Sequence, residues 1–367
     1  MYGSLCKKGL FMKIIHCADL HLDSKLESNL PPKKSNDRKK EIVMAFHRMV
    51  DYAVQNGVEA EIIAGDLFDT NRMQPATKDV VLGKIAENSS VKFYYLCGNH
   101  DDGKSLFQGE LPQNLYVFSD RWTQFELGDV VISGVELTEE NRRHIYGGLM
   151  LDRDKFNIVT IHGDIKNDSG EHSLDRKALA DKGIDYLALG HFHSFETGEL
   201  GKNGMWCYCG CLEGRGFDEH GDKGFVLLDI ADDKTFKAEF IKNSRRDIVK
   251  VECDLSGVAD TSVMLGLIDR AVEGVSEDAM VKVELCGRLP QNARKDIDLF
   301  KKHLDERFWF VKVKDLTGIE LKPEDYVNDI SLKGEFIRKV MAENLPNELR
   351  DRVIECGLAA LSGQEVQ

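Results

Sequence analysis

The sequence predicts an α/β protein with more than one domain, and two observations lead to that prediction. The chain has 367 residues, which is long for a single hydrophobic core. Over roughly its first 240 residues, short apolar runs typical of strands alternate with amphipathic stretches typical of helices. This alternation is the pattern of stacked layers of strands and helices.

The expected elements follow in chain order. In the first part, strands are expected at 13–17, 61–64, 92–96, 130–135, 158–161, 186–189, 205–211 and 224–230. Helices are expected there at 38–56 and 77–87. A smaller α+β pattern follows, with strands at 249–253, 281–285 and 308–313 and helices at 261–272 and 294–304. The last stretch has apolar residues four or five apart, which predicts two helices separated by Pro346.

A polar stretch at 242–247 marks the expected boundary between the two patterns. We therefore expect an N-terminal extension at 1–12, a main domain at 13–245, a small α+β domain at 246–320 and a helical segment at 321–367. Met12 is an alternative start of the chain, because the first expected strand begins at the next residue.

The composition is that of a globular protein that does not cross a membrane. Apolar residues make up 42% of the chain and charged residues 31%. No window approaches about 18 uninterrupted apolar residues. The apolar run near the N-terminus is interrupted by Lys13 and lacks a cleavage site, so no signal peptide is expected. Nine cysteines without CxxC spacing suit a reducing compartment, so we expect a cytoplasmic protein.

Five short polar segments each follow an expected strand, and they carry the chemistry of the sequence. The segments are ADLH, GDLFD, GNHD, HGD and GHFH. Their candidate functional residues are Asp19, His21, Asp66, Asp69, Asn99, His100, Asp101, His162, His191 and His193. Because ligands gather at the carboxyl ends of strands in open α/β sheets, we expect these side chains to converge on one place.

The residue types in these segments favour a metal centre. Carboxylate, amide oxygen and imidazole together suit manganese, iron or zinc better than magnesium, which prefers oxygen alone. Two metal ions ~3.5–4 Å apart would clamp the attacking and leaving oxygens of a phosphoester. Taken alone, each segment has an alternative structural interpretation, in which it is a turn, a helix cap or a histidine that packs at a strand end. The five segments in this order favour the metal centre over those alternatives.

The ordered set DxH, GDxxD, GNHD, HGD and GHxH resembles the signature of the calcineurin-like metallophosphoesterases. The resemblance covers roughly the first 230 residues and implies a β-sandwich flanked by helices, with a dinuclear metal site on one edge. It implies that the first metal ion is held by Asp19, His21, Asp66 and His193. It implies that the second is held by Asp66, Asn99, His162 and His191. Asp66 would bridge the two ions together with a hydroxide.

The same resemblance assigns two further residues. His100 is not a ligand in the family and would lie over the phosphate, where it stabilises charge or protonates the leaving oxygen. Asp101 would orient His100. At Asp69 the sequence differs from several relatives, which have a histidine at the corresponding position. That departure leaves the balance between exonuclease and endonuclease activity open.

Three longer segments resemble the SbcD branch of the family, especially its YhaO-like exonucleases. They are MKIIHCADLHLDS, RKKEIVMAF and GCLEGRGFDEHGDKGF. This resemblance implies manganese-dependent cleavage of DNA ends, a homodimer, and a capping domain that corresponds to the small α+β pattern. It also implies an SbcC-type ATPase partner, which would bind the helices expected at 332–361. The alternative is that these helices pack on their own domain.

The formal charge of −14 has to be reconciled with a DNA substrate, because binding to phosphates normally depends on clustered Lys and Arg. Metal ions, a local basic patch or a basic partner would each supply positive charge. The candidate DNA contacts are Lys33, Lys34 and Arg38, in the densest basic run of the sequence, together with Arg215. The alternative for the basic run is a solvated loop and helix start.

Two other functions remain as alternatives. One is a calcineurin-like phosphatase or phosphodiesterase that acts on a small phosphoester or a phosphoprotein, because the metal motifs alone do not distinguish these substrates. The other is a binding subunit with a degenerate site. The complete set of expected ligands argues against the second alternative.

Overall fold

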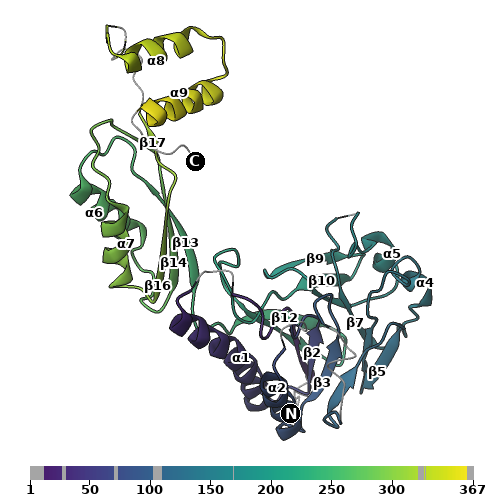
Figure 1. The fold of residues 1–367 in the computed structure, drawn as a ribbon. Helices are drawn as coiled ribbons and strands as arrows, with labels where there is room; N and C mark the ends of the chain where they lie inside the picture. Colours follow the sequence, from purple (N-terminus) through teal and green to yellow (C-terminus); the bar gives the residue numbers. More distant parts are fainter. Residues whose placement is uncertain are drawn as a thin grey trace, which may run out of the picture. The chain divides into compact units, whose positions relative to one another are not determined.

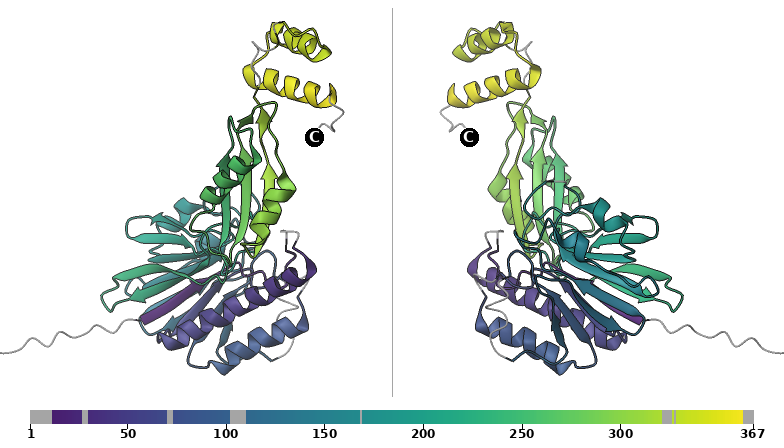
Figure 2. Two further views of the ribbon diagram at one scale, coloured as in Figure 1. Left: turned by 90° about the vertical axis from the view of Figure 1, so that its left-hand side faces the viewer. Right: turned by 90° about the vertical axis from the view of Figure 1, so that its right-hand side faces the viewer.

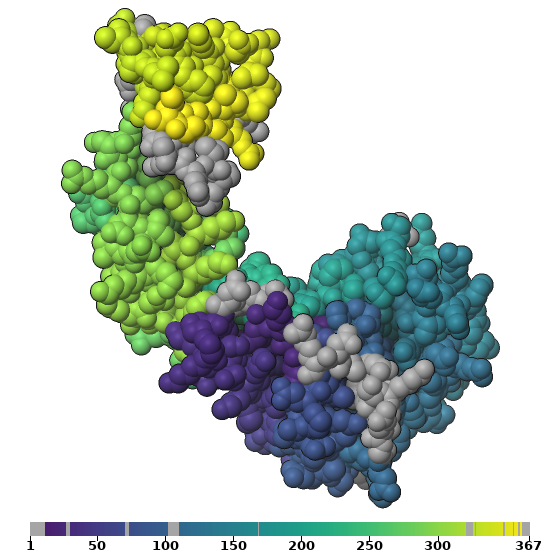
Figure 3. All heavy atoms as spheres, in the orientation of Figure 1, coloured from purple at the N-terminus to yellow at the C-terminus, as the bar shows by residue number. Residues whose placement is uncertain are grey.

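The structure is a computed structural model that describes residues 12–26, 30–69, 73–101, 110–167, 169–320, 326 and 328–361. The chain divides into two compact units, Met1–Ile248 and Val249–Gln367, and each is described by itself (Figures 1 and 3). No helix among the described residues is both long enough and apolar enough to cross a membrane.

The first unit contains two six-stranded sheets. The first sheet has, in spatial order, β12 (Phe236–Lys242), β11 (Gly224–Ile230), β1 (Met12–Cys17), β2 (Ala60–Ala64), β3 (Lys92–Leu96) and β4 (Leu115–Val117). The second sheet has β5 (Thr123–Leu127), β6 (Val130–Gly134), β7 (Phe156–His162), β8 (Tyr186–Gly190), β10 (Gly204–Tyr208) and β9 (Glu196–Leu200). Strands β1 to β4 are parallel to one another, and so are β6, β7, β8 and β10.

The two sheets face each other across a shared apolar core. Ile14 and Ile62 of the first sheet and Ile158 of the second belong to this core. The neighbouring residue Ile15 points to the opposite face of the first sheet, because successive side chains of a strand alternate. Both faces of the inner strands are therefore buried, which explains their continuous apolar runs.

Helices cover the outer faces of both sheets. The helices α1 (Pro32–Gln55) and α2 (Pro75–Glu87) lie side by side and pack on the first sheet (Figure 2). The short helices α4 (Ile145–Gly148) and α5 (Arg176–Ala180) contribute to the core on the outer face of the second sheet. The expected β-sandwich flanked by helices is confirmed.

The second unit contains a three-stranded sheet in the order β13 (Ile248–Asp254), β14 (Met280–Cys286) and β16 (Phe310–Asp315). The helices α6 (Thr261–Ala271) and α7 (Ile297–Asp305) belong to the same apolar core. Asp260 and Asp296 cap these helices by accepting backbone N–H groups of the first turn. A short parallel pair, β15 (Arg288–Leu289) and β17 (Gly318–Ile319), forms a separate two-stranded sheet. The helices α8 (Leu332–Ala342) and α9 (Asn347–Leu361) pack on each other through an apolar cluster of their own.

Helix α1 begins six residues earlier than expected, and this changes the interpretation of the basic run. Pro32 begins the helix, where its missing N–H is tolerated in the first turn. Arg38 therefore lies in the second turn, and its side chain is fully buried. Its guanidinium donates to Glu213 Oε1 at 2.7 Å and to Glu41 Oε2 at 2.9 Å. The hypothesis that Arg38 contacts DNA is wrong, because this side chain has no access to a ligand.

The carboxylate of Glu213 connects α1 to two other segments of the first unit. Its side chain is fully buried and also accepts from Arg48 at 3.0 Å and from the backbone N–H of Arg245 at 2.6 Å. Arg246 in turn pairs with Glu41 at 2.7 Å. Buried charges of this kind are stable only while each has its partner.

Replacing Glu213 by Ala should therefore leave the buried Arg38 charge without its strongest partner. We expect the free energy of unfolding to fall by about 3–5 kcal/mol, measured by urea denaturation. The matched control is Glu126→Ala, because Glu126 is 71% exposed and pairs with Lys155 at 2.7 Å. Removal of that exposed pair should cost no more than about 1 kcal/mol. Equal destabilisation in both variants would contradict the assigned role of Glu213.

Candidate metal centre

The five polar segments meet where the carboxyl ends of strands from both sheets come together. Asp19 follows β1, Asp66 follows β2 and Asn99 follows β3, all in the first sheet. His162 ends β7, and His191 follows β8, both in the second sheet. The convergence that we expected from the sequence is therefore present, although it involves two sheets.

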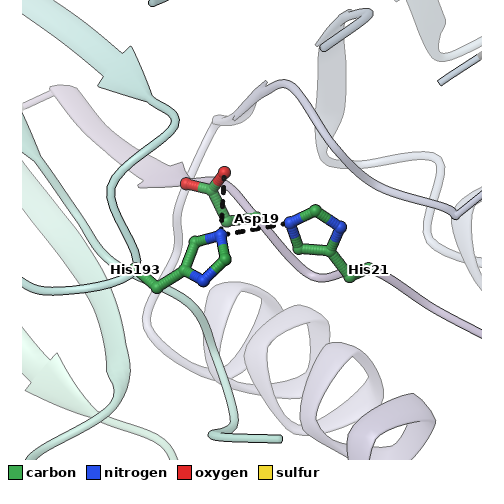
Figure 4. Close-up of side chains that lie close together, drawn as sticks. All are labelled: Asp19, His21 and His193. Carbon is green, nitrogen blue, oxygen red and sulfur yellow. Dashed lines mark hydrogen bonds and ion pairs between the residues drawn. The ribbon is translucent and has the colours of Figure 1, made fainter. Parts of the chain in front are cut away.

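One cluster of donor atoms consists of Asp19, His21 and His193 (Figure 4). The Nε2 atoms of His21 and His193 lie 3.2 Å apart, and His193 Nε2 lies 3.9 Å from Asp19 Oδ1. Asp19 and His21 are buried, and the side chain of His193 is 28% exposed. The cluster is thus open to solvent on the side of His193.

A second cluster consists of Asp19, Asp66 and His162. His162 Nε2 lies 3.3 Å from Asp66 Oδ2 and 3.0 Å from Asn99 Oδ1. The same Oδ2 atom of Asp66 lies 3.5 Å from His21 Nε2, a donor of the first cluster. Asp66 thus belongs to the second cluster and also lies beside a donor of the first, while Asp19 belongs to both clusters.

His191 lies beside the second cluster. The centroid of its ring is 5.5 Å from that of His162. Its backbone N–H donates to both carboxylate oxygens of Asp19, each at 3.0 Å. This pair of hydrogen bonds joins the strand end after β8 in the second sheet to the strand end after β1 in the first.

Outer contacts orient two of the histidine rings. The Nδ1–H of His193 donates to Glu219 Oε1 at 2.7 Å, and the Nδ1–H of His162 donates to the carbonyl of Ala64 at 3.0 Å. Each ring therefore turns Nε2 toward the carboxylates. Histidine ligands of metal ions are commonly held in this way by a carboxylate or a backbone carbonyl.

The electrostatics of the two clusters fit a bound cation. Burial raises the pKa of Asp19 to about 6 and lowers the pKa of His21 to about 3. Burial also opposes charge on His162, but the hydrogen bond to Asp66 and the nearby carboxylates outweigh it and raise the pKa of the ring to about 9. At each of these contacts of 3.0–3.5 Å a hydrogen or a metal ion has to lie between the two facing atoms. Binding of a metal ion would displace the ring protons from these positions.

The backbone at the site is strained in a way that aims the donors. Asp19, His21, Asp66 and His191 have φ values of 54°, 46°, 51° and 111°, in the left-handed region that favours glycine. Among the described residues, only two other non-glycine residues have positive φ, Asp23 and Lys234. Such strain costs on the order of 1–3 kcal/mol per residue and is concentrated at functional sites.

The glycines of the motifs are required by close approach. A Cβ atom at Gly65 would lie 2.1 Å from His162 Nδ1. A Cβ atom at Gly98 would lie 2.1 Å from Asp66 Oδ1, and one at Gly190 would lie 2.7 Å from His162 Nδ1. The glycine that precedes the candidate ligand in the segments GD, GN and GH therefore leaves room for a second candidate ligand from another strand of either sheet.

His100 and Asp101 lie at the site in different ways. The ring of His100 is exposed and meets the ring of His21 edge to face, with the centroids 5.0 Å apart. Its backbone N–H donates to Asp66 Oδ1 at 2.8 Å. Asp101 accepts from the backbone N–H groups of Phe68 at 2.9 Å and of Leu67 and Gly98, both at 3.1 Å. These three bonds tie the loop after β2 to the loop after β3, so Asp101 positions backbone that carries candidate ligands, and its expected role of orienting His100 stays a prediction.

The candidate DNA contacts are dispersed. Lys33 is exposed and Lys34 is half-buried, both in the first turn of α1. Arg215 lies next to the first cluster, with its Nη2 atom 3.1 Å from His193 Nδ1 and its Nε–H donating to Glu219 at 3.0 Å. Asp69 and Arg215 both line a small cavity of about 410 Å³.

Two residues at the site were not singled out from the sequence. Glu219 holds His193, and the ring of His172 lies 5.4 Å from that of His191. Glu219 belongs to the segment GRGFDEHGDKGF, but no spacing rule connects it to a histidine 26 residues earlier. His172 lies in a loop without periodic pattern, so no sequence signal identifies it.

Comparison with known proteins agrees with this geometry. Residues 12–195 match the family model described as calcineurin-like phosphoesterase. The uncharacterized metallophosphoesterase YhaO of Bacillus subtilis is 29% identical over 237 residues, which are 60% of this chain and 57% of that protein. The chain thus spans little more than half the length of that relative.

Two archaeal relatives match over more of their length. The DNA double-strand break repair protein Mre11 of Halobacterium salinarum is 23% identical, covering 75% of this chain and 70% of that protein. The protein of the same name from Haloferax volcanii is 26% identical over 360 residues, covering 95% of this chain and 75% of that protein. Because the family model covers half of the sequence, the chain belongs to the calcineurin-like phosphoesterase family.

Proposed function

We propose that the protein is a dinuclear, metal-dependent nuclease of the SbcD type that hydrolyses phosphodiester bonds at DNA ends. The observation that carries the proposal is the pair of donor clusters, which have Asp19 in common and in which the Asp66 carboxylate lies 3.3 Å from His162 and 3.5 Å from His21. Membership of the phosphoesterase family supports the reaction class. The names of the archaeal relatives support DNA as the substrate.

We assign Asp19, His21, Asp66 and His193 to the first metal ion. We assign Asp66, Asn99, His162 and His191 to the second. The mixed oxygen and nitrogen donors favour manganese, with iron, zinc or magnesium as alternatives. When bound, two such ions would supply the Lewis acidity and the activated water of phosphoester hydrolysis.

Within this proposal, two groups of the protein orient histidine ligands and His100 acts on the substrate. Glu219 and the Ala64 carbonyl fix the rings of His193 and His162, so that their Nε2 atoms face the centre. The exposed ring of His100 lies beside His21, where it can approach a bound phosphate and donate a proton to the leaving oxygen.

The second unit supports a nuclease over a phosphatase for small substrates. The alignment with the Haloferax volcanii protein covers 95% of this chain and so includes most of this unit. We propose that its α+β part caps the DNA and that α8 and α9 bind an SbcC-like ATPase, in a complex built on a homodimer. Large apolar side chains near these helices are exposed, namely Ile330 at 100%, Leu332 at 67% and Leu349 at 49%, as expected of a partner surface.

The test is a cleavage assay on end-labelled linear duplex DNA with manganese, run beside a small chromogenic phosphodiester. Shortening of the DNA supports the nuclease proposal. Cleavage of the small diester alone, both without and with the ATPase, would support the alternative phosphatase or phosphodiesterase function.

The variant His100→Ala should keep its metal ions and lose turnover. Removal of a group that transfers a proton should lower DNA cleavage by about 10²–10⁴-fold. Metal content is measured by elemental analysis of the dialysed protein. The control is His303→Ala, because His303 is an exposed histidine of the second unit that pairs with Asp269. Loss of metal from His100→Ala would show that the ring is a ligand, and unchanged turnover would show that it has no catalytic role.

The variant Gly98→Ala should displace the shared carboxylate. The added Cβ would lie 2.1 Å from Asp66 Oδ1 and 2.5 Å from the backbone nitrogen of Asp66, so the ligand must move. A displacement of this size should lower turnover by about 10²-fold, with weaker manganese binding in a titration.

Gly83→Ala provides the matched control for this substitution. A Cβ at Gly83, in α2, has no heavy atom within 4 Å, so metal binding and turnover should match the wild type. If Gly98→Ala binds manganese as tightly as Gly83→Ala, the close packing of the two ligand loops does not matter for the site.

A further inference from the structure

A basic cavity of about 840 Å³ lies over the outer face of the second sheet, outside the two donor clusters. Its walls come from the turn before α4, α4 itself, the loop after β7, the start of α5, and strands β9 and β10. The hydroxyl of Tyr146 accepts the backbone N–H of Asp175 at 2.8 Å and so fixes α4 against α5. Five cationic side chains line the cavity: Arg142, Arg143, Lys166, Arg176 and Lys177.

The carboxylates that line the cavity are already engaged. Glu196 pairs with Lys166 at 2.6 Å. Asp175 accepts the backbone N–H groups of Lys177 and Ala178 and so caps α5. These two carboxylates therefore neutralise at most part of the charge that the five cations bring.

The other four cations keep their charge available. Arg142 donates to the carbonyl of Glu171 at 2.9 Å, and Arg176 donates to the carbonyl of Glu199 at 2.6 Å. Carbonyl groups are neutral, so these bonds orient the guanidinium groups without cancelling their charge. Within the described part of the chain, no carboxylate pairs with either of these side chains, nor with Arg143 or Lys177.

The cavity is connected to the candidate metal centre through two segments. The loop that follows the ligand His162 forms one wall, and in this loop His172 touches the ring of His191 while the next residue, Ser173, lines the cavity. The second segment is 191–193, which follows β8. Its middle residue, Phe192, lies between the proposed ligands His191 and His193, and its ring centroid is 4.1 Å from Lys166 Nζ in the cavity.

We propose that this cavity binds the phosphodiester backbone of the DNA strand next to the phosphate that is cleaved. The inference rests on the proposed nuclease function and adds a substrate-binding surface to it. Binding of phosphates needs cations that no carboxylate neutralises, and the chain as a whole carries a formal charge of −14. The cations come from three successive segments, which suits a row of phosphates better than a single anion.

The test uses the double variant Arg143→Gln, Lys177→Gln, because both side chains are exposed. Binding of a fluorescently labelled DNA duplex is measured over a range of salt concentrations, and cleavage of the duplex and of a small chromogenic diester is measured with manganese. The matched control is Arg121→Gln, Lys237→Gln, which removes the same charge from exposed positions of the first unit that do not line the cavity.

We expect the cavity variant to bind the duplex about tenfold more weakly than the control variant. The slope of log affinity against log salt concentration should become shallower by about 1 for each DNA phosphate that the substituted side chains no longer neutralise. For DNA cleavage, KM should rise and kcat should stay unchanged. The small diester reports on the metal centre alone, so the cavity variant should cleave it at the wild-type rate.

Three results would overturn the inference. DNA binding equal to that of the control variant would show that the cavity does not hold the strand. Equally reduced cleavage of DNA and of the small diester would show that the substitutions disturb the metal centre instead. A wild-type protein that cleaves the small diester and neither binds nor cleaves DNA would overturn both the proposed function and this inference.

Discussion

The structure of the first unit depends on the burial of two carboxylates where its sheets meet. Asp19 and Asp66 are both essentially inaccessible to solvent, and a buried carboxylate is costly unless positive charge compensates it. The backbone of His191 binds Asp19, and the backbone of His100 binds Asp66, so the loops of both sheets close around these two groups. The two sheets thus meet at the same two carboxylates whose burial calls for a compensating cation.

The local sequence around the carboxylates is explained by this crowding. Left-handed backbone at Asp19 and Asp66 and the missing side chains of Gly65 and Gly98 allow candidate ligands from different strands to approach within a few ångströms. Strain of this kind is stable only because the surrounding core is rigid, and the inner strands are buried on both faces. The basic cavity beside the centre uses the same loops, so that one set of strand ends supports both the candidate chemistry and the inferred binding of substrate.

The sequence predicted the eight inner strands of the first unit and missed the four at the sheet edges, β4, β5, β9 and β12. Edge strands have partly exposed residues and therefore lack continuous apolar runs; β9, for example, is exposed at three of its five positions. The five motif segments were predictable because each carries its own signal next to a buried strand. The burial of Arg38 was not, because it depends on Glu213, 175 residues away in the sequence.

The shared carboxylate of Asp66 is proposed to hold two metal ions, and the number of ions bound per chain is the most direct measurement of this role. Manganese would be titrated into the chelator-treated protein, and its stoichiometry and positions would be determined by calorimetry and by anomalous diffraction. We predict two ions per chain, one on each side of Asp66, and weakened binding of both in Asp66→Ala. A single ion, or binding that survives the removal of the Asp66 carboxylate, would contradict the account.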